Sequence, residues 1–295
     1  PPPARQNVHH HMVRAVNCDP QRQTVTLADG TNVSYHLVSF NVGSVVATGT
    51  LTIEQGVPAM KPFDQLPSFA RWLAQTTPDR QYHISIVGGG PTGLELAGQL
   101  SARYPQRLAI TVFNRTQPGI TLPAGARRRV LDILKQRGVQ MRLAAAVQTV
   151  ERDHLMCNNE RHEHDMAILA TGLTPTRFAC DSGLGDEHGI PVRATLQHVD
   201  YDDIYAVGDG AHFTPGPLRK LGVHGVRQGP ILEQSLLARR AGQPLPVYKP
   251  RQHVLRIIDL GGGTALATRG RWWAEGPLLR QLKRTIDSRW LAQYQ

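Results

Sequence analysis

The stretch ISIVGGGPTGLELAG, residues 84–98, joins an apolar run to a helical pattern through G-x-G-x-x-G at Gly88, Gly90 and Gly93. In a dinucleotide site the first glycine permits the tight turn, and the second lets a pyrophosphate approach the backbone. The third lets helix and strand pack closely, and the helix N-terminus presents N–H groups to the anion. Because a strand precedes this pattern and a helix follows it, the stretch predicts a dinucleotide-binding βαβ unit. A glycine-rich turn without a ligand is the alternative.

Secondary-structure patterns on both sides of the loop extend this unit. Apolar runs of strand length alternate with helical patterns, which predicts a parallel sheet with right-handed crossovers. The expected strands are 83–87, 108–113, 139–143 and 166–170, and the expected helices are 92–104 and 124–137. Upstream, strands are expected at 12–17, 23–27 and 33–42 as a small meander, followed by a short helix at 69–75.

The coenzyme preference depends on the residues that end the second strand of the unit. A site for NAD(H) usually places an acidic residue on the adenosine ribose, about twenty residues past the loop. This chain has Asn114 and Arg115 there instead. We expect Arg115 to meet a 2′-phosphate, which favours NADP(H) over NAD(H); a solvated loop arginine is the alternative.

A second glycine-containing strand end lies further along the chain. The buried strand 204–207 runs into Gly208-Asp209-Gly210, where a glycine allows a sharp turn and an aspartate can accept hydrogen bonds from a ribityl or ribose chain. The segment 35–44 also resembles 164–173, because each is a polar-then-apolar strand that leads to a glycine. A nicotinamide site together with a polyol-binding motif implies two dinucleotides, nicotinamide and flavin.

Composition narrows the choice of function classes. The 295 residues carry a net charge of +10, and the whole excess lies in residues 213–295, which hold 14 Lys and Arg against 4 Asp and Glu. A basic block beside a neutral body suggests an anionic surface or ligand, but no nucleic-acid-binding motif accompanies it. The three cysteines form no C-x-x-C pair, which argues against a dithiol redox centre, and no apolar run is long enough to cross a bilayer.

Three motifs together resemble the two-dinucleotide-binding flavoproteins of the pyridine nucleotide-disulfide oxidoreductase type. They are GGGPTGLELAGQL, the strand DMAILATG, and IYAVGDGA preceded by ATLQHVDYDD. Within that superfamily the chain is similar to type II NADH dehydrogenase-like proteins. It most resembles the branch sometimes fused to selenide, water dikinase, through SYHLVSFNVGS, PLRKLGVHGVRQGPIL and the tail from LPVYKPRQHVLRIIDLGGGTALATRG to LKRTIDSRW. The resemblance covers essentially the whole chain.

The resemblance implies an α/β fold with two dinucleotide-binding (Rossmann-like) domains, the first incomplete, plus a small C-terminal region. The implied parts are a partial FAD-binding domain (1–78), an NAD(P)-binding domain (79–175), the second segment of the FAD-binding domain (176–240) and a basic C-terminal region (241–295). In this superfamily the FAD pyrophosphate sits on a G-x-G-x-x-G loop ahead of the meander. This chain begins just before the meander and without a methionine, so we expect that loop to be missing from it.

The resemblance also implies roles for single residues. Asp209 would bind the FAD ribityl chain, and the helix that begins near Gly222 and Val223 would point its N-terminus at the flavin pyrimidine. Glu95 would be the catalytic residue near the nicotinamide–flavin contact, steering the carboxamide or moving a proton; an acid in the first helical turn that complements the dipole is the alternative. The full implied cofactor-binding set is Gly88, Gly90, Gly93, Asn114, Arg115, Gly172, Gly43, Gly208, Asp209 and Val223.

The implied activity is transfer of hydride from NAD(P)H to FAD and onward to an acceptor, either a quinone or a selenium- or sulfur-linked compound. Quinone-reducing members carry an A-Q-x-x-Q-like helix beside the flavin, and only Gln228 matches it here. One alternative is a non-catalytic, truncated dinucleotide-binding module that has lost flavin. Another is a docking module that binds through its basic residues. We expect a cytoplasmic protein, or one peripheral on the inner face of the membrane.

Two further patterns allow several interpretations. The pair His162-x-His164 with Cys157 nearby has spacing suited to a metal, but polar hairpins collect such residues and we expect no metal site. The tail combines an apolar helical stripe with basic residues, as in a helix at an anionic membrane surface; core packing or a homodimer contact explains it equally well. The stripe comprises Trp272, Trp273, Leu278, Leu279, Leu282, Ile286 and Trp290, and the basic residues are Arg280, Lys283, Arg284 and Arg289.

Overall fold

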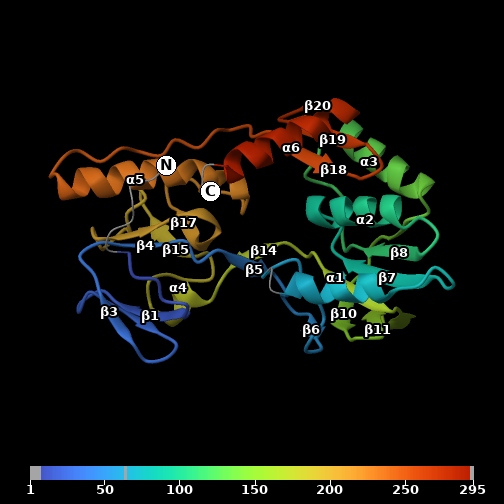
Figure 1. Cartoon of the computed structure of the whole chain (residues 1–295), viewed down its shortest axis with the longest axis horizontal. Helices are drawn as coiled ribbons and strands as arrows, with labels where there is room; N and C mark the ends of the chain where they lie inside the picture. The colour runs from blue at the N-terminus through green and yellow to red at the C-terminus, as the bar shows by residue number, and fades with distance from the viewer. Residues whose placement is uncertain (1–7, 63–64, 293–295) are drawn as a thin grey trace. The chain divides into compact units, whose positions relative to one another are not determined.

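The computed structural model describes residues 8–62 and 65–292, and the chain divides into two compact units (Figure 1). The first unit comprises the chain up to Val45 together with Leu173–Gln252, and the second comprises Val46–Gly172 together with the chain from His253 onward. Each unit is therefore assembled from two separate stretches of sequence.

The second unit is built on a four-stranded parallel sheet. Its strands are β7 (Tyr82–Val87), β8 (Leu108–Phe113), β9 (Gln140–Arg142) and β13 (Met166–Leu169), in the order β13-β7-β8-β9. The two crossover helices are α2 (Pro91–Arg103) and α3 (Ala124–Gln136). The apolar side chains Ile84, Ile86 and Val112 share one core with residues of these helices. The predicted α/β unit with a parallel sheet is thus confirmed.

A second, mixed sheet in this unit includes β6, which explains why the boundary between the two units lies before that strand. It consists of β6 (Thr52–Ile53), β10 (Val147–Val150), β11 (His154–Cys157) and β12 (Glu160–Glu163). Residues after β6 also join the parallel sheet: the Met60 N–H donates to the Leu169 carbonyl at 3.1 Å, and the Leu169 N–H donates to the Pro58 carbonyl at 3.0 Å. The helix α1 (Leu66–Gln75) adds Phe69 to the same core as Ile84. The boundary therefore lies at Val45, well before the expected position at residue 78.

The C-terminal segment is part of the second unit and differs from the separate region expected at 241–295. It forms β18 (Arg256–Asp259), β19 (Ala265–Arg269), β20 (Trp272–Glu275) and α6 (Pro277–Leu291). Leu260 and Leu266 belong to the core that contains Leu94 of α2. A Cβ atom at Gly98 of α2 would lie 2.9 Å from the Leu260 Cα, so this glycine allows the close approach. The physical reason for the difference is this long-range apolar packing.

The first unit begins with the predicted antiparallel meander. Its strands are β1 (Ala15–Asp19), β2 (Thr24–Leu27) and β3 (Asn32–Ser34). The single strand expected at 33–42 is instead two, because the chain bends after β3 and β4 (Val38–Phe40) pairs in parallel with β16 (Ile204–Ala206). The unit also holds β15 (Ile190–Val192), β17 (Ala211–Phe213), α4 (Phe178–Asp181) and α5 (Gly222–Arg240). The short strands β5 (Ser44–Val46) and β14 (Leu173–Pro175) form where the chain passes between units.

Candidate functional site

The Gly88–Gly93 loop lies between the end of β7 and the start of α2, as the sequence predicts. Gly88 has a φ of 120°, and a Cβ there would lie 2.2 Å from the Ala170 carbonyl oxygen. A Cβ at Gly93 would lie 1.9 Å from the Gly88 carbonyl oxygen, whereas a Cβ at Gly90 would meet nothing within 4 Å. Two glycines are therefore required by the turn itself, and the third leaves open space beside the helix N-terminus.

The N-terminus of α2 has features suited to an anion. Gly90 is its N-cap and no side chain caps the helix, so the first-turn N–H groups are available to a ligand. Pro91 follows at the first helical position, where its missing N–H costs nothing. The open space at Gly90 and the uncapped N–H groups together fit a phosphate.

Asn114 holds this loop in place, which the sequence did not indicate. Its Oδ1 accepts the Gly89 N–H at 2.8 Å, and its Nδ2 donates to the Thr116 carbonyl at 2.8 Å. A further backbone bond joins the Gly119 N–H to the Gly89 carbonyl at 2.7 Å. The Asn114 amide is thus committed to the protein, whereas Arg115 is exposed and makes no hydrogen bond or ion pair to another residue of the described chain. Arg115 is the free group of this pair.

Glu95 is directed to the C-terminal segment. Its Oε1 accepts the Asp259 N–H at 3.1 Å and forms an ion pair with the ammonium of Lys283. The Glu95 side chain is 29 % exposed. It also lies in the second turn of α2, which excludes the alternative of a first-turn acid. The observed role of Glu95 is to join α2 to β18 and α6.

In the first unit the ends of β4 and β16 meet, because the two strands are parallel neighbours. Asp209 is 9 % exposed, and its carboxylate accepts a hydrogen bond from the Ser44 hydroxyl at 2.8 Å. Gly208 has a φ of 70°, and a Cβ there would lie 2.9 Å from the Asn41 Oδ1. Gly43 also has a positive φ, of 72°. The structure therefore brings Gly43, Gly208 and Asp209 together at one edge.

The helix α5 starts beside this edge. A Cβ at Gly225 would lie 3.3 Å from the Gly208 Cα, so the first turn of α5 packs closely on the strand end. Gln228 is 1 % exposed and its Oε1 accepts the Gly208 N–H at 2.7 Å. No side chain caps α5 at Leu221, so the N–H groups beyond it, including that of Val223, are not satisfied by a side-chain cap. The Gln228 side chain therefore has a structural role, because it binds the backbone of Gly208.

Two ionisable groups near this edge were not singled out in the sequence. His224 is buried, its Nδ1 lies 3.1 Å from the Tyr248 hydroxyl, and burial lowers its pKa. Lys220 donates from Nζ to the carbonyls of His188 and Ala211, both at 3.0 Å, and burial lowers its pKa while the charge of Asp209 opposes that shift. Only the basic charge of this segment could have drawn attention to them.

The two units repeat one arrangement at their exit strands. Both β4 and β13 lie in parallel pairs and lead to a glycine with positive φ, 72° at Gly43 and 106° at Gly172. In the second unit β13 pairs with β7, the strand that carries the phosphate loop. Among the residues that the structure describes in the first unit, no strand carries a counterpart of Gly88–Gly93. The internal echo seen in the sequence thus corresponds to equivalent positions in the two folds.

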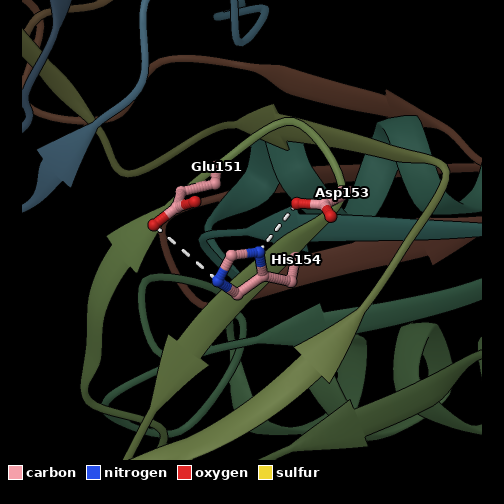
Figure 2. Close-up of side chains that lie close together, drawn as sticks. All are labelled: Glu151, Asp153 and His154. Carbon is pink, nitrogen blue, oxygen red and sulfur yellow. Dashed lines mark hydrogen bonds and ion pairs between the residues drawn. The ribbon is translucent and has the colours of Figure 1, made fainter.

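The two histidines of the β11–β12 hairpin, His162 and His164, each contact another group of the protein. The His162 ring packs edge-on against Phe113 at 5.2 Å, and the His164 Nε2 lies 3.0 Å from the Glu151 carbonyl oxygen. Another cluster occurs at the neighbouring turn, where the His154 ring lies between two carboxylates (Figure 2). Its Nδ1 is 2.7 Å from the Asp153 Oδ1 and its Nε2 is 3.7 Å from the Glu151 Oε1.

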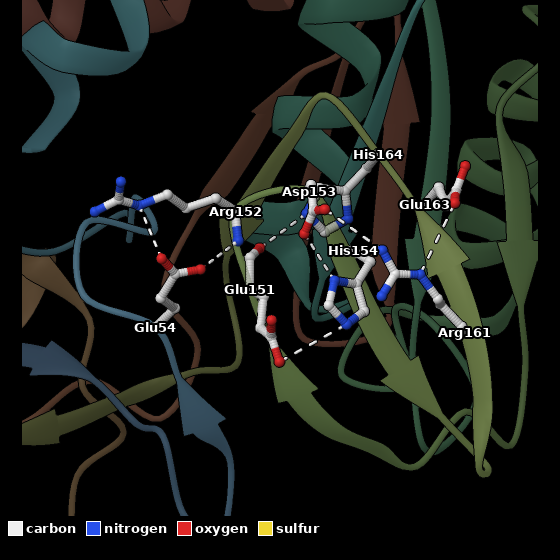
Figure 3. A network of polar contacts seen from close by, with 8 residues as sticks. All are labelled: Glu54, Glu151, Arg152, Asp153, His154, Arg161, Glu163 and His164. Carbon is white, nitrogen blue, oxygen red and sulfur yellow. Dashed lines mark hydrogen bonds and ion pairs between the residues drawn. The ribbon is translucent and has the colours of Figure 1, made fainter.

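Ion pairs extend from this cluster across the turn (Figure 3). Arg152 pairs with Glu54 at 3.1 Å, which links the β10–β11 turn to the end of β6. Arg161 reaches the Asp153 Oδ2 at 3.4 Å. Both carboxylates around His154 are exposed, and each has a partner in the protein. We therefore interpret these ion pairs as a network that stabilises the conformation of the turn.

Comparison with known proteins gives matches along most of the chain. Residues 4–230 match the family described as pyridine nucleotide-disulphide oxidoreductase. Ferroptosis suppressor protein 1 of Taeniopygia guttata is 26 % identical over 259 residues, which are 80 % of this chain and 65 % of that protein. The type II NADH:quinone oxidoreductase Ndh of Mycobacterium tuberculosis is 26 % identical, over 59 % of this chain and 44 % of that protein. The chain therefore spans about half to two thirds of the length of these relatives.

The fold also matches solved structures. The sulfide:quinone oxidoreductase of Aquifex aeolicus superposes with a TM-score of 0.70 at 16 % identity, covering 95 % of this chain and 74 % of that one. At this identity the likeness concerns the fold alone, and it supports the α/β dinucleotide-binding architecture described above.

Proposed function

Because this chain belongs to the pyridine nucleotide-disulphide oxidoreductase family, we propose that it transfers reducing equivalents from NAD(P)H through FAD to an acceptor. The observation that carries the proposal is the Gly88–Gly93 loop, whose two sterically required glycines and one open glycine face an uncapped helix N-terminus. This combination is typical of a pyrophosphate site.

On the second unit, the chain's own groups account for nucleotide binding. The first-turn N–H groups of α2 would hold the pyrophosphate in the space beside Gly90, and Asn114 would keep the loop in the required shape. Arg115, exposed at the end of β8, would contact the ribose end and its 2′-phosphate. Gly172 would allow the dinucleotide to pass close to the end of β13.

On the first unit, the buried edge formed by Gly43, Gly208 and Asp209 supports flavin binding. The Asp209 carboxylate accepts the Ser44 hydroxyl, and carboxylate oxygens are the kind of acceptor that ribityl hydroxyls bind. The first-turn N–H groups of α5, near Val223, would favour negative charge at the pyrimidine end. When bound, flavin supplies a two-electron carrier between nicotinamide and acceptor, and the protein supplies alignment.

The acceptor belongs to the proposal as well. A quinone is favoured by the sequence similarity to the mycobacterial type II NADH:quinone oxidoreductase. Gln228 does not discriminate between the two kinds of acceptor, because its Oε1 accepts the Gly208 N–H. A selenium- or sulfur-linked acceptor rests on the resemblance to the branch fused to selenide, water dikinase.

Peripheral attachment to an anionic membrane would suit a quinone acceptor. In the described part of the chain, no helix combines the length and apolarity needed to cross a bilayer. On α6, however, Leu278, Leu282 and Ile286 follow one another at i,i+4 spacing and are 82, 42 and 46 % exposed. Arg284 and Arg289 are exposed on the same helix. An apolar stripe with basic neighbours is the pattern of a helix that lies in a membrane interface.

Two of the four tail cations have partners within the protein. Arg280 pairs with Asp259 at 3.3 Å, and Lys283 pairs with Glu95. Fewer positive charges are therefore available to bind an anionic membrane than the sequence indicated. The alternative is that a second copy of the chain binds the apolar stripe of α6.

One titration separates the enzyme from a binding module. The purified chain is incubated with FAD, its visible spectrum and flavin fluorescence anisotropy are recorded, and NADH or NADPH is then added without oxygen. We expect flavin binding that Asp209→Asn weakens, followed by bleaching of the flavin absorbance. Nicotinamide binding with no flavin binding would instead support the non-catalytic module, and a chain that binds neither would refute both.

A further inference from the structure

The strand β7 contains an unusual polar pair on one of its two covered faces. Ile84 and Ile86 face the core shared with α2 and α3, while His83 and Ser85 alternate onto the other face. Strands of a parallel sheet covered on both sides usually read as continuous apolar runs. Ser85 is 3 % exposed, and its hydroxyl makes no hydrogen bond to any residue of the described chain. The Ser85 hydroxyl is not fully buried; it borders the accessible space on this face of the sheet, where a ligand or water can bind it.

Neighbouring strands add polar groups at the same level. Thr111 of β8 is the registered partner of Ser85, so both side chains lie on one face of the sheet. Arg142 of β9 is registered opposite Phe113, on that same face. These residues, together with His83, Arg161 and His162, line a cavity of about 230 Å³ between the sheet and β12. The cavity is large enough for several water molecules, at ~30 Å³ each.

The charges around this cavity favour an anion. Arg142 forms no ion pair with any acid in the described part of the chain. Arg161 reaches two acids only loosely, Asp153 at 3.4 Å and Glu163 at 3.8 Å (Figure 3). Glu163 is the single acid among the lining residues, and Arg161 pairs with it and with Asp153, so Arg142 is the lining guanidinium group that no carboxylate of the described chain neutralises. Guanidinium groups with nearby hydroxyl donors match the oxygen geometry of a phosphate.

We propose that the Ser85–Arg142 cavity binds a small phosphate-bearing molecule, such as a phosphate monoester, at a site separate from the Gly88–Gly93 loop. The loop lies beyond the end of β7, at the start of α2, whereas Ser85 lies inside the strand on the face turned away from α2. The two guanidinium groups bind the phosphate oxygens, and the hydroxyls of Ser85 and Thr111 donate to it. The site belongs to the second unit alone and does not depend on flavin.

The test uses the whole chain and calorimetry with inorganic phosphate and glycerol phosphate, in a chloride buffer. Loss of one charged hydrogen-bond partner is expected to weaken binding about tenfold or more in Arg142→Ala. Ser85→Ala, which removes one hydroxyl, is expected to weaken it about fivefold. Arg128→Ala, an exposed arginine on α3 outside the cavity, is the matched control and should bind as the unmodified chain does.

A second pair of measurements separates this site from the dinucleotide loop. Gly90→Asp places a negative charge in open space, so it should repel phosphate from the loop while leaving the fold and the cavity intact. Phosphate binding that survives Gly90→Asp and is lost in Arg142→Ala supports the proposal. Binding that is lost in Gly90→Asp, or retained in Arg142→Ala with an unchanged melting temperature, overturns it. Binding of malonate in preference to both phosphates overturns the assignment to phosphate.

Discussion

The carboxylate of Glu95 and the ammonium of Lys283 form an ion pair between positions 188 residues apart in the chain. Glu95 lies on the helix that follows the phosphate loop, and Lys283 lies on α6. The same oxygen of Glu95 also accepts the Asp259 N–H at 3.1 Å. The C-terminal segment is therefore fastened to the helix that would bind the nucleotide phosphates.

A double-mutant cycle measures how much the ion pair between Glu95 and Lys283 contributes to stability. Because both side chains are about 30 % exposed, we expect a coupling energy of ~0.5–1 kcal/mol between Glu95→Gln and Lys283→Met in urea unfolding. Glu95→Gln keeps an acceptor for the Asp259 N–H, so its own cost should be small. A coupling energy near zero would mean that the pair does not hold the segment in place.

The loop glycines should respond differently to the same substitution. Gly93→Ala places a methyl group 1.9 Å from a backbone oxygen, so we expect a loss of stability of ~2 kcal/mol or more and loss of nucleotide binding. Gly90→Ala enters open space at a φ of −72°, so it should change stability by less than ~0.5 kcal/mol. It should nevertheless weaken NAD(P)H binding, since the methyl group occupies the space beside the phosphates. Thermal unfolding and fluorescence titration of NADH test both variants.

Arg115 should determine coenzyme preference. Its guanidinium is exposed and unpaired within the described chain, so Arg115→Glu is expected to weaken NADPH binding relative to NADH about tenfold or more. Arg128→Glu on α3 changes the net charge equally and should leave the ratio unchanged. An unaltered NADPH to NADH ratio in Arg115→Glu would show that NADP(H) preference does not come from this residue.

Stability should fall in mild acid because of a buried histidine. Burial lowers the pKa of His224 from 6.5, so the unfolded chain takes up a proton first as the pH drops. The neutral imidazole therefore contributes stability above pH 6.5, and this contribution declines as the pH falls below that value. His224→Gln removes the titrating group, so its stability should change less between pH 7.5 and 5.5. Equal slopes in urea unfolding for the two proteins would contradict this.

The apolar stripe of α6 gives a test with lipid vesicles. The chain should sediment with vesicles that contain phosphatidylglycerol and not with pure phosphatidylcholine, and Ile286→Asp should reduce the bound fraction several-fold. Leu237→Asp on α5 replaces another exposed leucine, 59 % exposed, and serves as the control. Concentration-dependent dimerisation that Ile286→Asp abolishes, without vesicle binding, would assign the stripe to a second copy.

Local periodicity was enough to predict much of the second unit. The expected strand 108–113 coincides with β8, and the expected helices 92–104 and 124–137 differ from α2 and α3 by a residue at most at each end. These elements combine apolar periodicity with glycine signals, which depend on neighbouring residues alone.

Long-range contacts account for what the sequence did not reveal. The partner of Glu95 lies 188 residues away, and the residues that moved the boundary to Val45 bond to Leu169. The strand 83–87 was interpreted as simply apolar, although His83 and Ser85 alternate with isoleucines in it. That alternation was a readable signal of a polar face. The set of residues around it, from β8, β9 and β12, could only come from the folded sheet.

The parallel pairing of Val38 with Ile204 has a consequence for synthesis on the ribosome. Chains emerge N-terminus first and domains form as their residues become available. When β4 leaves the exit tunnel, the whole middle of the second unit must still be translated before β16 appears. The nascent chain therefore carries an unpaired strand until β16 emerges, and a chaperone that shields exposed strand edges could act during that interval.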